Sequence, residues 1–149
     1  MNYLGYQIFK GFSESEYALL APLLTEKQLT EGAAVFLESM PGEALYLIKS
    51  GTIRISKMLG EGEEKILVVL GPGDHFGEMA ILDGSARAAT ARVLEQVELM
   101  ILRKADFESF SAAHPAIALK MIKNIVKDFC HKLHESNREI KDLVLGTLK

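Results

Sequence analysis

The sequence has a single cysteine, Cys130, and no tryptophan. One cysteine excludes an internal disulfide and leaves no cysteine cluster for zinc or an iron–sulfur centre, which favours a reducing compartment. No segment approaches the roughly 18 consecutive apolar residues of a membrane span. The amino terminus lacks the basic start and long apolar core of a signal peptide. These absences predict a cytoplasmic protein that does not contact a membrane.

The chain also has no excess of basic residues. It contains 17 Lys and Arg residues and 20 Asp and Glu residues, which gives a net charge of -3. Binding to a phosphate backbone generally depends on clustered basic side chains, so we predict that this chain itself binds no nucleic acid. Its 149 residues suit one domain with a substantial core. We therefore predict a single domain over residues 1–149.

Apolar periodicity predicts an α+β chain that is mainly β. Ser13 and Glu16 form a predicted capping box at the start of a short amino-terminal helix. Short segments rich in Val, Ile and Leu follow, separated by Gly, Pro or charged turns, and this spacing indicates an antiparallel barrel or sandwich over about residues 26–104. The predicted strands are residues 35–38, 45–49, 52–57, 65–70, 88–93 and 97–103.

Helical periodicity takes over in residues 105–145. His114 and Pro115 interrupt it, and we predict a long helix from Pro115 to about Leu145 with Gly146 as its C-cap. Asp128 and Lys132 are predicted to pair on its exposed side. Apolar residues alternate at spacings of three and four, as in a two-stranded coiled coil, so we predict a homodimer; the alternative is packing on the chain's own barrel. This apolar seam comprises Leu119, Ile122, Val126, Phe129, Leu133, Ile140 and Leu143, with Ser136 as its one polar member.

The most informative segment is Phe76–Thr90, which carries groups suited to a phosphate attached to a ribose. Glu78 can accept a hydrogen bond from a sugar hydroxyl. Arg87 offers a planar fork of donors to two phosphate oxygens, and small residues beside it let a ligand approach the backbone amides. A short helix opened by Gly77 would direct amide groups at the same anion. The predicted pocket residues are Phe76, Gly77, Glu78, Met79, Ala80, Arg87, Ala88 and Ala89.

This ordered set resembles the phosphate-binding cassette of the cyclic-nucleotide-binding domain, the family of the catabolite activator protein and the regulatory subunits of cAMP-dependent protein kinase. The resemblance implies a jelly-roll barrel flanked by an amino-terminal helix and a long carboxy-terminal helix. It also implies that Glu78 holds the ribose and that Arg87 holds the cyclic phosphate. The alternative is an ordinary Glu78–Arg87 ion pair among ordinary turns. One departure is Ser39-Met40, where the family usually has glycine and an acidic residue.

The same resemblance extends to recognition of the base. Ser136 and Asn137 align with two positions of the long helix that contact adenine in the catabolite activator protein. The alternative is that Ser136 only sets helix register and that Asn137 is solvated. Members selective for cGMP commonly have Thr or Ser after the cassette arginine, whereas this chain has Ala88. The predicted ligand is therefore cAMP, with cGMP less favoured.

The sequence gives little support for an enzymatic function. His75 near Glu78 suggests a metal-dependent enzyme of the cupin kind, but a metal site needs about three or four convergent ligands. Cys130 with His131 and His134 is a second candidate group, although a thiol beside a helix seam usually packs. No nucleophile signature is present. We predict no catalytic residues, no metal and no cofactor.

The predicted function is a non-enzymatic cAMP receptor or regulatory domain that couples ligand binding to movement of its carboxy-terminal helix and signals to an unknown downstream protein. The alternative is the sensory domain of a longer DNA-binding transcription regulator. In that case a helix-turn-helix, which this chain does not contain, would follow the long helix.

Overall fold

A computed structural model describes residues 3–147 of the chain. Its amino-terminal segment contains the 3-10 helices η1 (Tyr3–Gly5) and η2 (Gln7–Phe9), the helix α1 (Glu14–Leu20) and the 3-10 helix η3 (Ala21–Leu23). The predicted capping box is confirmed at the start of α1. The Glu16 amide donates to Ser13 Oγ at 3.2 Å, and the Ser13 amide donates to Glu16 Oε1 at 2.9 Å.

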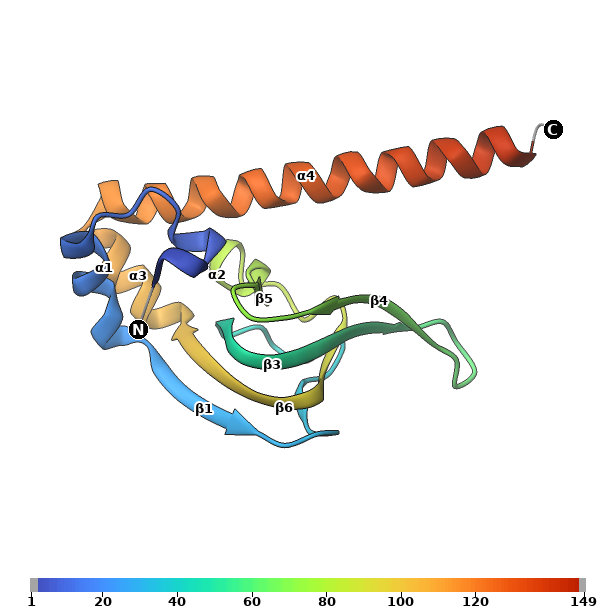
Figure 1. The fold of residues 1–149 in the computed structure, drawn as a ribbon, viewed down its shortest axis with the longest axis horizontal. Helices are drawn as coiled ribbons and strands as arrows, with labels where there is room; N and C mark the ends of the chain where they lie inside the picture. Colours follow the sequence, from blue (N-terminus) through green and yellow to red (C-terminus); the bar gives the residue numbers. More distant parts are fainter. Residues whose placement is uncertain (1–2, 148–149) are drawn as a thin grey trace.

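Within residues 3–147, six strands form one antiparallel sheet, as predicted. Its main path runs β1-β6-β3-β4, with β2 beside β6 and β5 beside β3 (Figure 1). This mainly antiparallel sheet with flanking helices agrees with the expected fold class. The strands are β1 (Thr25–Leu29), β2 (Ala34–Phe36), β3 (Ala44–Met58), β4 (Glu64–Leu70), β5 (His75–Phe76) and β6 (Thr90–Arg103).

Two long strands replace pairs of predicted short ones. The predicted strands 45–49 and 52–57 leave a break around Gly51, but β3 continues through it, with register shifts against β6 on both sides. Gly51 has φ +84°, and a Cβ there would lie 2.0 Å from the carbonyl oxygen of Gln96. Glycine thus lets the strand bend without ending, because no other residue tolerates this approach. The sequence reading missed β1, which is polar and mostly exposed, and the two-residue β5.

The apolar core has two parts. One lies between the helices and the adjacent end of the sheet, and it includes Phe9, Leu45, Leu102, Met121 and Ile125. The other is enclosed by the curved sheet, and it includes Phe36, Ile48, Ile53, Val97 and Leu99.

The carboxy-terminal helices are α3 (Lys104–Ala113) and α4 (Pro115–Thr147), so the predicted long helix is confirmed. It passes through Gly146, which is therefore not a C-cap in this structure. The amino-terminal half of α4 packs on the other helices, and its other half extends past α2 and β5 (Figure 1). None of the helices in residues 3–147 combines the length and apolar character needed to cross a membrane.

The apolar seam divides between two environments. Ile122 and Phe129 are half-buried against the chain's own core. The other five members are exposed: Leu119, Val126, Leu133, Ile140 and Leu143. The buried residues of α4 lie on a neighbouring face: Ile117, Ala118, Met121 and Ile125.

Candidate functional site

A cavity of about 160 Å³ opens beside α2 (Met79–Leu82). Eight of the ten predicted site residues line it, all of them from the segment Phe76–Ala89. These eight are Phe76, Gly77, Glu78, Met79, Ala80, Arg87, Ala88 and Ala89. The sequence reading missed further lining residues from the sheet and from α4, namely Phe36, Ile55, Val68, Leu70, His75 and Lys132.

Gly77 is required by both its backbone conformation and its surroundings. Its φ is +77°, and a Cβ there would lie 2.7 Å from Arg87 Nη1 and 3.2 Å from the Ala44 carbonyl oxygen. Glu78 then serves as the N-cap residue of α2, although its side chain does not cap the helix. The Ala80 amide donates to the Gly77 carbonyl at 3.3 Å, so this amide is not free for an anion. A one-turn helix also contributes little dipole, so the site depends mainly on other groups.

Arg87 is the central charge of the cavity. It is 7% exposed, and it donates from Nη1 to the Gly77 carbonyl at 3.1 Å and from Nη2 to the Ala44 carbonyl at 2.8 Å. Its guanidinium carbon lies 4.1 Å from the centre of the Phe36 ring and 5.6 Å from that of Tyr46. Burial lowers the pKa of Arg87, while Tyr46 and Glu78 oppose that shift. The guanidinium nevertheless stays charged.

The structure describes no anion partner for this charge. Within residues 3–147, no carboxylate forms an ion pair with Arg87, and its buried Nε has no hydrogen-bond partner. The simple Glu78–Arg87 ion pair is therefore not found. In the same range, the amides of Ala88 and Ala89 donate to no backbone carbonyl. A buried cation beside two unpaired amides is suited to binding an anion.

The segment Ser39-Met40 positions the backbone of Arg87. The Ser39 amide donates to the Arg87 carbonyl at 2.8 Å, and the Arg87 amide donates to the Met40 carbonyl at the same distance. Ser39 has φ +74°, the only positive φ at a non-glycine residue in 3–147. Serine thus adopts here the left-handed conformation for which glycine is suited.

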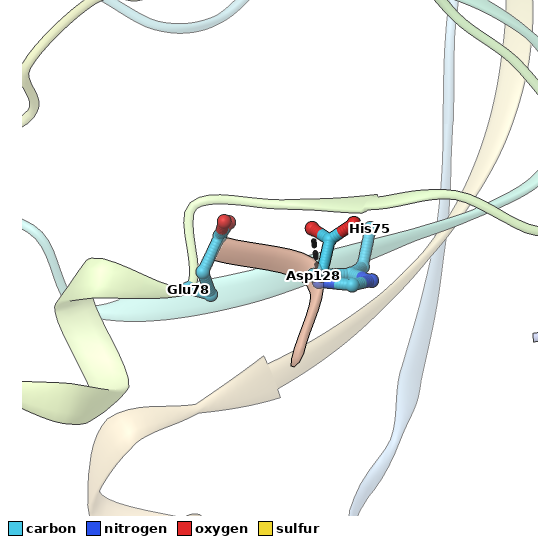
Figure 2. Close-up of side chains that lie close together, drawn as sticks. All are labelled: His75, Glu78 and Asp128. Carbon is cyan, nitrogen blue, oxygen red and sulfur yellow. Dashed lines mark ion pairs between the residues drawn. The ribbon is translucent and has the colours of Figure 1, made fainter. Parts of the chain in front are cut away.

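The other wall of the site comes from α4. Lys132 lines the cavity, and it donates to Asp128 Oδ2 at 2.9 Å. This pair was predicted on the exposed side of the helix, but Asp128 is mostly buried and faces His75, whose Nε2 lies 3.7 Å from Asp128 Oδ2. Tertiary packing of α4 on the sheet turns that face inward. Figure 2 shows His75, Glu78 and Asp128 converging from three elements.

The predicted base-binding residues lie outside this group of converging side chains. Ser136 and Asn137 are exposed and do not line the cavity. Asp128, Lys132 and Ser136 are nevertheless spaced by four residues, which places them along one side of α4.

Comparison with known proteins agrees with this geometry. Residues 26–114 match the model of the cyclic nucleotide-binding domain. The CRP-like cAMP-activated global transcriptional regulator of Mycobacterium tuberculosis is 30% identical over 137 residues, which are 92% of this chain and 59% of the regulator. The chain thus spans about three fifths of that protein's length.

Two solved structures are also similar. The catabolite activator protein of Thermus thermophilus superimposes with a TM-score of 0.81 at 30% identity, covering 92% of this chain and 62% of that one. The amino-terminal domain of a transcriptional regulator from Streptomyces coelicolor has a TM-score of 0.77 at 25% identity, covering 93% of this chain and 95% of that one.

Proposed function

Because the chain belongs to the cyclic nucleotide-binding domain family, we propose that it is a cytoplasmic receptor domain for cAMP with no catalytic activity of its own. In this proposal Arg87 and the amides of Ala88 and Ala89 bind the cyclic phosphate. Glu78 accepts a hydrogen bond from the ribose. The relative from Mycobacterium tuberculosis is described as cAMP-activated, which supports this choice of ligand.

The observation that carries the proposal is the buried charge of Arg87. A charged group inside a protein is costly unless it is paired, and among the described residues Arg87 contacts neutral carbonyls and aromatic rings but forms no ion pair. A cyclic phosphate would supply one negative charge and acceptor oxygens for the unpaired Nε and the two amides. Stacking on Phe36 keeps the guanidinium plane fixed before the ligand arrives, which reduces the entropic cost of binding.

The test is titration calorimetry with cAMP on the variant Arg87→Ala. We expect binding to weaken by about 2 to 5 kcal/mol, the range for removing one partner of a buried charge pair. Arg87→Lys should also bind poorly, because an ammonium group does not reproduce the fork. The matched control is Arg92→Ala, since Arg92 is a half-buried arginine that bonds the Gly32 carbonyl outside the cavity. Near wild-type affinity in a folded Arg87→Ala variant would contradict the proposal.

Selectivity for adenine is proposed on two grounds. Ala88 has no hydroxyl for the guanine amino group, so cAMP should bind more tightly than cGMP. Ser136 lies one helical turn beyond Lys132 on the same side of α4, about 6 Å along the axis, where a base extending from the cavity would reach it. Competition binding checks the first point: cGMP should displace cAMP only at higher concentration, and Ala88→Thr should narrow the difference. Equal potency in the wild type would refute it.

We further propose that the receptor is a homodimer through the apolar seam. Leu119, Val126, Leu133 and Ile140 recur every seven residues along α4 and are all exposed. Such a row on one helix is typical of the contact line of a two-stranded coiled coil. A second copy would bury it.

Signalling would follow from the position of Lys132 at the cavity wall and from its ion pair with Asp128. If cAMP prefers one placement of α4 by about 1 to 3 kcal/mol, the helix population shifts by roughly 5- to 150-fold, which a downstream protein can read. Hydrogen exchange of residues 130–147 with and without cAMP tests this coupling. Unchanged exchange at saturating cAMP would contradict it.

A second candidate is the sensory domain of a longer transcription regulator. It is favoured by the agreement with the Streptomyces coelicolor amino-terminal domain over nearly the full length of both chains. The reading frame of the gene decides the matter. A helix-turn-helix segment encoded after residue 149 would support this candidate, and a stop codon there would exclude it.

A further inference from the structure

Three ligating side chains converge where α4 meets the cavity. His75 comes from β5, Glu78 from the N-cap of α2, and Asp128 from the middle of α4 (Figure 2). One ligating atom from each lies within 4.8 Å of the other two. The sequence reading rejected a metal site because it counted too few ligands near His75. Packing of α4 adds the third ligand, across about 50 residues of chain.

The environment of His75 indicates what kind of ligand the cluster binds. Its side chain is 4% exposed, and within residues 3–147 its buried Nε2 has no hydrogen-bond partner. That nitrogen faces Asp128 Oδ2 at 3.7 Å, which is too long for a hydrogen bond. An imidazole nitrogen that carries no proton has a lone pair that can bind a cation, and the buried, unpartnered Nε2 is placed to do so.

We propose that His75 Nε2 and the carboxylates of Glu78 and Asp128 bind a divalent transition metal ion, with Zn²⁺ as the preferred ion. One imidazole and two carboxylates are ligands that Zn²⁺ accepts, and three protein ligands leave one open position. Ligand atoms around tetrahedral Zn²⁺ lie about 3.4 Å apart, so small side-chain rotations close the site. The bound ion would connect α4 to the segment that carries Glu78.

Lys132 makes the site distinctive. Its ammonium group bonds Asp128 Oδ2 at 2.9 Å, so it competes with the metal for that carboxylate. Removing this positive charge should therefore strengthen metal binding. A zinc site that does not use Asp128 lacks this direct competition for a ligand.

The first experiment titrates the full chain with Zn²⁺ by calorimetry, without nucleotide, and repeats the titration with Co²⁺ to record its absorption spectrum. We expect one ion per chain and a loss of at least tenfold in affinity for His75→Gln and for Asp128→Asn. Asp128→Asn keeps the side-chain shape, so it remains informative if His75→Gln does not fold. The matched control is His131→Ala, because His131 pairs with Glu135 at 3.3 Å on the exposed side of α4 and is the alternative surface site.

Two results would overturn the proposal. One is the absence of one-to-one binding by the wild type. The other is binding that survives Asp128→Asn but is lost in His131→Ala. The variant Lys132→Met provides an independent check: metal affinity should rise severalfold, and an unchanged affinity would exclude Asp128 as a ligand.

The metal should also compete with cAMP, a consequence that rests on the proposed function because both would use Glu78. Adding Zn²⁺ should raise the apparent Kd for cAMP in the wild type but not in Asp128→Asn. The two proposals fail separately. Metal binding without any cAMP binding would contradict only the receptor function, and cAMP binding without metal binding would contradict only the metal site.

Discussion

The two halves of α4 have similar apolar periodicity but different surroundings. In residues 115–129 the helix buries Ile117, Ala118, Met121 and Ile125 against the core. In residues 130–147 every residue is exposed, including Leu133, Ile140 and Leu143. Periodicity therefore identifies a face that will be covered, but it does not identify what covers it. The buried stripe of the first half is covered by this chain, whereas the exposed seam, which includes Leu119 and Val126 of the first half, is not covered by the residues that the structure describes.

The boundary between the halves coincides with the cavity. Asn124 Nδ2 donates to the carbonyls of Ile8 and Lys10, each at 2.9 Å, and anchors the first half to the amino-terminal segment. Lys132, about two turns further along α4, lines the cavity. A ligand there thus contacts α4 at the point where its anchoring ends, which is where a small change can reorient the unsupported half.

The largest effect should come from truncating the packed half. Ile125 is fully buried, so Ile125→Ala should lower the free energy of unfolding by about 2 to 5 kcal/mol through lost burial and a cavity. The neighbouring Val126 is 47% exposed, so Val126→Ala should cost less than about 0.5 kcal/mol in the monomer. Urea unfolding at low protein concentration measures both. Equal losses in the free energy of unfolding for the two variants would mean that α4 does not bury Ile125 in preference to Val126.

The second half should respond through assembly and not through folding. Leu133 is 60% exposed, so Leu133→Asp should leave monomer stability nearly unchanged. It should weaken dimerisation by roughly 30-fold or more, because a charge replaces about 2 kcal/mol of apolar burial. Sedimentation equilibrium measures the dimerisation affinity of both proteins. A wild type that stays monomeric at tens of micromolar with saturating cAMP would show that the seam is not a dimer interface.

Ser136 should separate assembly from ligand binding. Ser136→Leu replaces the polar member of the seam with the residue favoured at that heptad position, so dimerisation should tighten by roughly 1 kcal/mol. Loss of the hydroxyl and added bulk should lower cAMP affinity at the same time. Sedimentation and calorimetry on this variant test both effects. Unchanged cAMP affinity would show that Ser136 does not contact the base.

The smallest effect concerns the surface anchor of the packed half. Lys120 Nζ bonds Glu16 Oε1 at 2.7 Å, and this bond, with those to Ser13, lowers the pKa of Glu16 from 4.5 to about 2. Because the folded state lowers this pKa, the stabilisation is present above pH 4.5 and is lost as the pH falls toward 2. In acid titrations followed by circular dichroism, Lys120→Met should lose less stability over that range than wild type. Lys123→Met is the control, since Lys123 is an exposed lysine of the same helix.

Local signals explain why much of the fold was predictable. The capping box at Ser13 and Glu16, the start of α4 at Pro115, and the cassette from Phe76 to Ala89 each depend on residues close in sequence. The merging of strands across Gly51 was not predictable, because a glycine with positive φ fits a turn and a bulge equally well. The edge strand β1 was missed because its exposed polar residues show no alternation.

What the sequence by itself determined is the set of chemical groups that a pocket would need: a glutamate, an arginine and small residues around a tight glycine turn. Only the tertiary structure decided how these groups are paired. Among the residues that the structure describes, Arg87 bonds carbonyls and no carboxylate, and Asp128 reaches His75 from a helix about 50 residues away. The physical reason is that spacing along the chain sets which residues share one face of an element, whereas burial and charge pairing depend on which element that face meets.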